Sequence, residues 1–138
     1  MTERELDDGL RRAAAQQRAV AERALADLDL TPAQFAVLWI VMEQPGISAA
    51  DVARLERLTP PTVSVIVGNL IRKNALEKRP HPDNARIQQL SVTERGARLV
   101  QEGATRLEGS LCRIRSALPA GAEPLVKQWL RDIAESGA

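Results

Sequence analysis

The chain has 138 residues, 44% of them hydrophobic and 27% charged, with a net charge of +1. These proportions fit one globular domain with its own core, and no apolar run approaches the about 20 residues of a membrane span. The one cysteine excludes an intramolecular disulfide, and the charged start MTERELDDGLRR predicts no secretory signal, so we expect a cytoplasmic protein with no membrane partner.

Helices are predicted throughout the first half of the chain. Residues 2–28, 31–44 and 48–57 each begin at a threonine or serine that can cap a helix, and each carries apolar residues at helical spacing. In the third of these helices, Val52 and Leu55 are predicted to face the core.

The next helix is predicted over residues 59–73. Thr59 can cap it, and two prolines occupy its first turn, where no N–H group is needed. After residue 73 the pattern changes: residues 75–80 and 86–92 alternate in polarity around the turn cluster HPDNA, which predicts a β-hairpin. A long helix over residues 93–117 and a last helix with an apolar stripe around Trp129 complete the chain. The predicted fold is mainly α with a small β-hairpin, in one domain that spans residues 1–138.

The stretch LTPPTVSVIVGNLIRKN, residues 58–74, is the most informative about function. Its opposite sides differ: one is small and rich in hydroxyl groups, and the other is an inward stripe of Val63, Ile66, Val67, Leu70 and Ile71. Residues 57–76 contain no acid. Such a helix can approach DNA closely, because carboxylates would be repelled by phosphates and bulky side chains would hold the helix away from base edges.

Charge supports the same interpretation. Residues 46–98 carry nine Lys/Arg against five Asp/Glu, or +4, whereas the remaining residues carry ten against thirteen, or −3. A basic middle segment suggests a surface that faces a polyanion. On residues 59–73 alone, a helix covered on both faces by protein explains the small side chains equally well. A short helix, a tight turn, a second helix and a basic hairpin together favour a winged helix-turn-helix.

Catalytic and metal sites are not predicted. His81 is the one histidine and Cys112 the one thiol, so a single chain cannot assemble a Cys–His pair or a histidine-rich metal cluster. His81 falls in the hairpin turn, where a solvated loop side chain is the plainer interpretation. We expect a protein that is not an enzyme and has no metal or cofactor.

Three segments resemble the MarR family of bacterial transcriptional regulators: LTPAQFAVLWIV, PGISAADVARLERLTPPTVSVIVGNLIRKNALEKR and NARIQQLSVTERG. The resemblance covers residues 30–96 in motif detail and the rest only in helix order. It implies a winged helix-turn-helix region over residues 30–96 and a helical dimerisation region formed by residues 1–28 and 97–138. It also implies a homodimer that binds a palindromic operator in double-stranded DNA. We expect this homodimer to be a repressor that a small-molecule effector releases from the operator.

The resemblance also suggests DNA contacts. It places Thr62, Ser64, Val65 and Asn69 at bases or nearby phosphates, and Arg86 in the minor groove. Two residues depart from the family: Val65 stands where an arginine is usual, and Asn84 replaces the aspartate two residues before the hairpin arginine. Together with polar and basic neighbours, the predicted DNA-binding set is Ser48, Thr59, Pro61, Thr62, Ser64, Val65, Asn69, Arg72, Lys73, Arg79, His81, Asn84 and Arg86.

Apolar surface at both ends of the chain also predicts a dimer, because a small winged helix cannot cover so much of it alone. A monomer with one larger helical core is the alternative. The predicted dimer interface consists of Leu6, Leu10, Leu125, Trp129 and Ile133.

The family commonly responds to small aromatic or phenolic anions or to thiol oxidation. Gln17, Phe35, Trp39 and Arg106 are effector candidates, because the first, second and fifth helices are expected to meet there; core packing is the alternative for the two aromatic residues. Cys112 is predicted to be buried, and a redox-responsive regulator that uses Cys112 is the alternative function. A further alternative is a winged helix used only for protein–protein contacts.

Overall fold

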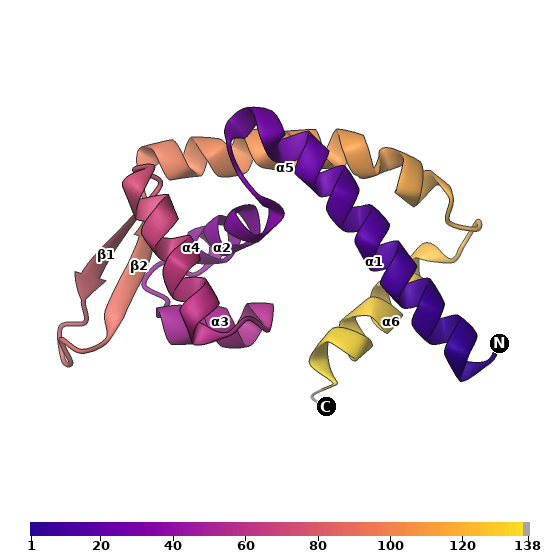
Figure 1. The fold of residues 1–138 in the computed structure, drawn as a ribbon, viewed down its shortest axis with the longest axis horizontal. Helices are drawn as coiled ribbons and strands as arrows, with labels where there is room; N and C mark the ends of the chain where they lie inside the picture. The colour runs from indigo at the N-terminus through magenta and orange to yellow at the C-terminus, as the bar shows by residue number, and fades with distance from the viewer. Residues whose placement is uncertain (137–138) are drawn as a thin grey trace.

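The computed structural model describes residues 1–136 and has the predicted order of helices around one hairpin. Its elements are α1 (Glu3–Leu25), the 3-10 turn η1 (Ala26–Leu28), α2 (Pro32–Glu43), α3 (Ala49–Glu56), α4 (Pro60–Arg72), β1 (Leu76–Pro80), β2 (Gln88–Val92), α5 (Glu94–Ser116) and α6 (Glu123–Glu135). Helix α5 runs along the top of the molecule in Figure 1. Beneath one half of it lie α2, α3, α4 and the hairpin, and α1 and α6 extend beneath the other half toward the two termini.

Side-chain caps explain where helices α1 to α5 begin. Thr2 and Thr31 both complete capping boxes, the first with Glu5 and the second with Gln34. Hydrogen bonds from the Thr2 backbone and hydroxyl lower the pKa of Glu5, because they stabilise its carboxylate. The single helix predicted over residues 2–28 is divided in the structure: α1 ends at Leu25, and the chain continues to Leu28 as the 3-10 turn η1. Asp29, which is left-handed at φ 53°, closes η1.

The core lies where the helices under α5 meet the hairpin. Its largest fully buried side chains are Leu25, Leu38, Leu70, Leu76, Leu90, Val37, Val41, Val52 and Val63. One prediction is wrong: Val52 on α3 is buried, but Leu55 is 49% exposed. The two residues are three apart on a helix of only eight residues, so helical spacing alone did not decide which of them the core covers.

The hairpin is confirmed, and it is joined by a third segment. Strands β1 and β2 pair antiparallel, with Leu76 opposite Val92 and Pro80 opposite Gln88. Residues 46–48 add to the other edge of β2: the Gly46 N–H donates to the Leu90 carbonyl at 2.8 Å, and the Leu90 N–H donates to the Ile47 carbonyl at 2.9 Å. These bonds fix the hairpin to the start of α3.

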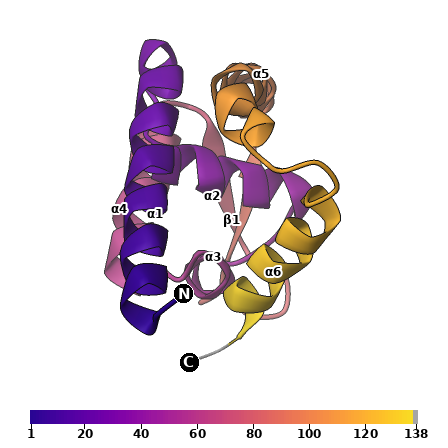
Figure 2. The ribbon, with the colours of Figure 1, turned by 90° about the vertical axis from the view of Figure 1, so that its right-hand side faces the viewer.

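Two glycines let α5 lie close to its neighbours. A Cβ at Gly96 would stand 2.1 Å from the carbonyl oxygen of Ala75, and a Cβ at Gly103 would stand 2.6 Å from Cε2 of Phe35. Helix α5 is viewed almost end-on in Figure 2, where α1 and α6 lie on opposite sides of the molecule. Helix α6 contains no buried residue.

Candidate nucleic-acid interface and ligand pocket

The turn between α3 and α4 sets the position of α4. Arg57 is left-handed at φ 52° and its N–H donates to carbonyls in the last turn of α3, which ends that helix sharply. Thr59 then caps α4: its hydroxyl accepts from the Thr62 N–H at 3.3 Å and lies 2.8 Å from the Thr62 hydroxyl. Together α3, this turn and α4 form a helix-turn-helix.

Helix α4 has the two faces that its sequence predicts. Val63, Ile66, Val67 and Leu70 are buried, whereas Val65 is 63% exposed. Pro61, Thr62 and Ser64 are exposed as well, and Asn69 is half-buried. The outward face is therefore free of acids and carries only small side chains along its first three turns.

Two polar side chains in the last turn of α4, Asn69 and Arg72, are hydrogen-bonded to each other. The Asn69 side-chain oxygen accepts a hydrogen bond from the guanidinium of Arg72, which is exposed. Because the amide of Asn69 is already oriented, Asn69 and Arg72 present a joint polar surface and not two independent side chains.

The hairpin turn is ordered by its own side chains. Asn84 Oδ1 accepts from the Arg86 N–H at 3.1 Å, and His81 Nδ1 accepts from the Asp83 N–H at 3.0 Å. Arg86 is exposed, and within residues 1–136 its guanidinium makes no hydrogen bond or ion pair. Arg79 lies 3.9 Å from Glu77 in an exposed ion pair. Asn84 thus orders the backbone that carries Arg86.

A groove separates α4 from the hairpin. Ser64 and Gly68 of α4 line one wall, and Lys78 and Gln88 of the hairpin line the other. Ser48 lies beside it, half-buried, and its hydroxyl is engaged as the cap of α3 through the Asp51 N–H at 3.1 Å. The structure thus brings Ser64 of the predicted helix residues and the basic Lys78 of the hairpin to one groove.

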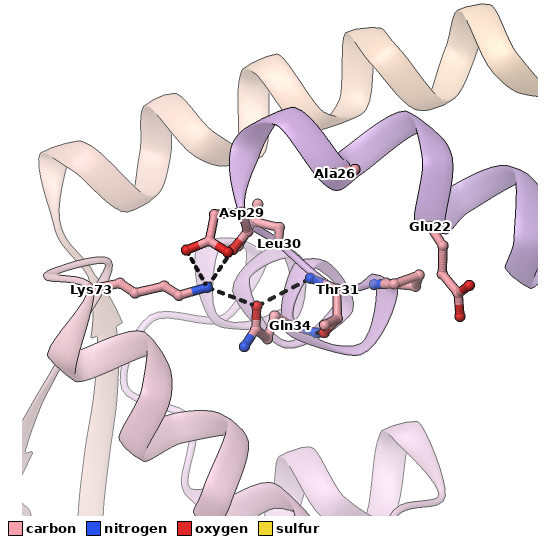
Figure 3. Close-up of a pocket in the computed structure, with 8 residues that line it drawn as sticks. Glu22, Ala26, Asp29, Leu30, Thr31, Gln34 and Lys73 are labelled. Atoms are coloured by element: carbon pink, nitrogen blue, oxygen red, sulfur yellow. Dashed lines mark hydrogen bonds and ion pairs between the residues drawn. The ribbon is translucent and has the colours of Figure 1, made fainter.

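Lys73 does not join this group. Its ammonium donates to the Asp29 carbonyl and, at 3.3 Å, to Gln34 Oε1, and it forms an ion pair of 3.4 Å with the Asp29 carboxylate (Figure 3). Only 27% of its side chain is exposed. Lys73 ties the end of α4 to the junction of α1 and α2, where a shallow pocket is also lined by Glu22 and Thr31.

An apolar pocket of about 420 Å³ lies where α1, α2 and α5 meet. Three predicted effector residues, Gln17, Phe35 and Trp39, line it, and the two aromatic rings have centroids 6.0 Å apart at 40°. Sequence reasoning missed the rest of the lining, which consists of Ala21, Leu25, Pro32, Ala36, Ile40, Glu56, Ala104 and Leu107. The helical spacing of the alanines in the first helix was the one feature of the sequence that indicated part of this lining.

Arg106, the fourth predicted effector residue, is not part of the pocket lining. Its guanidinium donates to Asp27 at 2.9 Å and to Glu102 at 3.1 Å. Hydrogen bonds with Glu102 and then Asp27 raise the pKa of Arg106, so it is a fixed cation between two carboxylates. Its role in the structure is to fasten α5 to η1, the 3-10 turn that follows α1.

The predicted interface residues are exposed or half-buried in the single chain. Leu125 is 75% exposed, Trp129 43%, Ile133 42% and Leu10 38%, and Leu6 is half-buried. The prediction for Cys112 is wrong, because its thiol is exposed on α5. The apolar residues beside it in sequence do not bury it, since this half of the helix extends beyond the core.

Residues 1–136 hold no cluster of three or more metal-ligating side chains. Within the same residues, no single helix is long and apolar enough to cross a membrane; one bent pair, Glu3–Leu28 with Pro32–Glu43 at 77°, meets the length and composition test.

The fold and these surfaces define a winged helix-turn-helix protein with a pocket between its helices. The family model of the MarR family matches residues 28–87. The HTH-type transcriptional repressor Rv2887 of Mycobacterium tuberculosis is 25% identical over 124 residues, which cover 90% of this chain and 89% of the repressor. Its solved complex with p-aminosalicylic acid has a TM-score of 0.75 to this structure at 24% identity, and the match covers 94% and 98% of the two chains.

Two further solved structures have the same fold. A MarR-family transcriptional regulator from Rhodococcus sp. RHA1 has a TM-score of 0.89 at 21% identity, covering 99% of this chain and 97% of its own. MepR of S. aureus, solved in complex with DNA, has a TM-score of 0.83 at 23% identity, covering 99% of both chains. Residues 28–87 thus match the MarR family of transcriptional regulators, and the chain has the fold of these solved regulators.

Proposed function

We propose that the protein is a cytoplasmic transcriptional repressor that binds a palindromic operator as a homodimer, and that a small aromatic effector releases it. One observation carries the DNA-binding part: the outward face of α4 is exposed and free of acids, and it adjoins a hairpin whose Arg86 has no partner within residues 1–136. Rv2887 is described as a repressor, and MepR has been solved with DNA, which supports the same function here.

The proposed contacts divide between bases and phosphates. Thr62, Ser64 and Val65 stand on the exposed part of α4, where short side chains allow base edges to come close. Arg72 and Arg86 supply charge at the end of α4 and on the hairpin, where guanidinium groups suit phosphates or a narrow minor groove. We leave Lys73 out of the interface, because Asp29 and Gln34 occupy its ammonium.

Exposed apolar residues at the chain ends support the homodimer. Leu125, Trp129 and Ile133 lie on a helix that buries none of its own residues. Exposed apolar surface of this kind marks an interaction site. We assign dimerisation to residues 1–28 and 97–138 and DNA binding to residues 30–96. Two copies would then present two α4 helices to the two halves of a palindrome.

The pocket supports the effector part. It is concave and mostly apolar, with two aromatic rings and the polar groups of Gln17 and Glu56 on its wall, which is the usual composition of a small-molecule site. It is built from α1, α2 and α5, and Glu56 comes from α3 of the helix-turn-helix. A bound molecule therefore touches both the end helices and the DNA-binding helices.

Selection of binding sites from random duplex DNA tests the proposal. We expect a palindromic consensus with two half-sites about one helical turn apart, because two copies related by a two-fold axis read the same sequence twice. Affinity for the selected duplex should fall with salt by a slope of about −0.9 per phosphate neutralised. A winged helix used only for protein–protein contacts would select no sequence and show no salt-dependent affinity.

Adjacent residues on opposite faces of α4 give a matched test. Val65 is 63% exposed, so Val65→Ala should leave the melting temperature near the parent value and weaken preference at one base step. Ile66 is 8% exposed, so Ile66→Ala should cost about 2–5 kcal/mol of stability and affect DNA binding only through folding. Melting curves and operator titrations of both variants make the comparison. If Val65→Ala melts early, or reads DNA as the parent does, the outward face of α4 is not the reading surface.

A further inference from the structure

The pocket between α1, α2 and α5 has an uneven charge. Among the residues that line it, Glu56 is the one with a formal charge, and Gln17 and the indole of Trp39 are the other side chains that can form hydrogen bonds. Neither lysine nor arginine is part of the lining. The nearest candidate from the sequence, Arg106, is held by Asp27 and Glu102 outside it.

The Glu56 carboxylate is also unpaired. It is half-buried, and within residues 1–136 it takes part in no hydrogen bond or ion pair. Within residues 1–136 no buried side-chain oxygen lacks a partner, so the Glu56 carboxylate stays in contact with solvent. A donor or a cation in the pocket can pair with it without displacing a partner in the chain.

The aromatic rings favour the same kind of molecule. Phe35 and Trp39 line the pocket with their centroids 6.0 Å apart, and the faces of aromatic rings attract cations. An anionic group placed here would meet the carboxylate and the negative ring faces, and no cation of the lining would balance it.

We propose that the effector pocket of this chain selects a cationic or hydrogen-bond-donating aromatic molecule, such as an aromatic amidine or amine, and rejects aromatic carboxylates through Glu56. This rests on the proposed function, since it assumes that the pocket is the effector site. It separates this chain from Rv2887, whose solved ligand, p-aminosalicylic acid, carries a carboxylate.

Three probes of one shape test the charge: benzamidine, benzamide and benzoate, which are cationic, neutral and anionic. We expect benzamidine to bind the full-length protein about tenfold more tightly than benzamide, and benzamide about tenfold more tightly than benzoate, because the charge lies within a few ångströms of Glu56 in a partly desolvated site. Calorimetric titration gives the three affinities, and release of the operator duplex gives the same order independently.

Two isosteric variants assign the effect. Glu56→Gln keeps the size of the side chain and should reduce benzamidine to the affinity of benzamide. Glu108→Gln makes the same change on an exposed residue of α5 outside the pocket lining and should keep the parent order. The order in the parent protein decides the inference even if Glu56→Gln fails to fold.

The outcomes are distinguishable. If the parent binds benzoate as tightly as benzamidine, the charge selection is wrong and effector binding stands. If Glu56→Gln keeps the parent order, the selection does not come from Glu56, and that assignment is wrong. If the parent binds none of the three probes and keeps its operator in their presence, the effector part of the proposed function fails, and the inference fails with it.

Discussion

Glycines on α5 show how single atoms shape the pocket. Gly103 does not line the pocket, but its missing side chain makes room for the ring of Phe35, which does. A Cβ there would stand 2.6 and 2.7 Å from two ring carbons and 3.2 Å from a methyl of Leu25. Gly109, six residues further along α5, has nothing within 4 Å of the corresponding position. Substitution by alanine therefore creates a steric clash at Gly103 and none at Gly109.

Gly103→Ala should narrow the pocket. The ring of Phe35 has to move by about 1 Å to reach an ordinary carbon–carbon distance. The core beside α2 is fully packed by Val37 and Leu38, so the ring moves into the open space of the pocket. We expect two-ring naphthamide to lose about tenfold or more in affinity and benzamide to lose less, since a pocket discriminates by about this factor for one methylene. Calorimetric titration with both compounds measures the difference.

Gly109→Ala is the control for Gly103→Ala. Both substitutions raise helix propensity, by up to about 1 kcal/mol, but only Gly103→Ala meets a neighbour. Equal affinities of the two variants for naphthamide would show that Gly103 does not set the width of the pocket. A crystal structure of Gly103→Ala would show the ring position without any ligand.

At the scale of elements, Lys73 anchors the end of α4. Its ammonium reaches the Asp29 carboxylate at 3.4 Å and Gln34 Oε1 at 3.3 Å, and Gln34 in turn caps α2 together with Thr31 (Figure 3). One side chain thus joins α4 to the end of η1 and the start of α2. Helix α4, which carries the proposed reading surface, is thus held to the start of α2, and α2 also lines the apolar pocket between α1, α2 and α5.

Lys73→Met should lower stability without removing a DNA contact. We expect a loss of about 1 kcal/mol, because Asp29 is largely solvated and the ion pair is worth little, whereas the hydrogen bonds to oxygen are worth more. The salt slope of operator binding should equal that of the parent. Denaturant unfolding and salt titrations measure the two quantities. A slope reduced by one phosphate, with stability unchanged, would return Lys73 to the DNA interface.

On the hairpin, unlike at Lys73, we expect substitutions to weaken DNA binding directly. Arg86→Ala should weaken binding to all duplexes alike and reduce the salt slope by about one phosphate's worth. Asn84→Ala keeps every charge but removes the acceptor for the Arg86 N–H at 3.1 Å, so affinity should fall while the slope stays near the parent value. Salt titrations of both variants on operator and unrelated DNA decide between charge and position. Arg86→Ala with the parent slope would exclude a phosphate contact.

Local features were predictable from the sequence and long-range ones were not. Helix starts followed from caps such as Thr31 and Thr59, and the two faces of α4 followed from its periodicity, because both depend on residues within a few positions of each other. The bridge between Ser48 and Gln89 joins residues that lie far apart in the chain, so no local pattern announced it. The same holds for Lys73, which was predicted to bind DNA, and for Arg106, which was predicted to bind the effector. Their partners Asp29 and Asp27 are distant in the sequence, so no local pattern indicated these ion pairs.

For the whole molecule, α6 is the clearest test of assembly. Leu125→Asp and Ile133→Asp place charges at positions that are 75% and 42% exposed in the single chain, so each costs an isolated chain little. In a dimer that buries these residues, an unpaired carboxylate is strongly unfavourable, and we expect the double variant to sediment as a monomer. Lys127→Gln on the same helix should remain dimeric. A double variant that dimerises like the parent would place the interface elsewhere.

Arg57 connects the two parts of the molecule by one bond. It ends α3 in the left-handed conformation, and its guanidinium donates to the carbonyl of Ala134 in the last turn of α6 at 2.7 Å. The proposed DNA-binding segment, residues 30–96, is therefore bonded to a helix outside it. A chimera that transplants residues 30–96 into another scaffold keeps Arg57 but loses its acceptor, and a designer who wants the turn between α3 and α4 in its native setting has to transplant α6 with it.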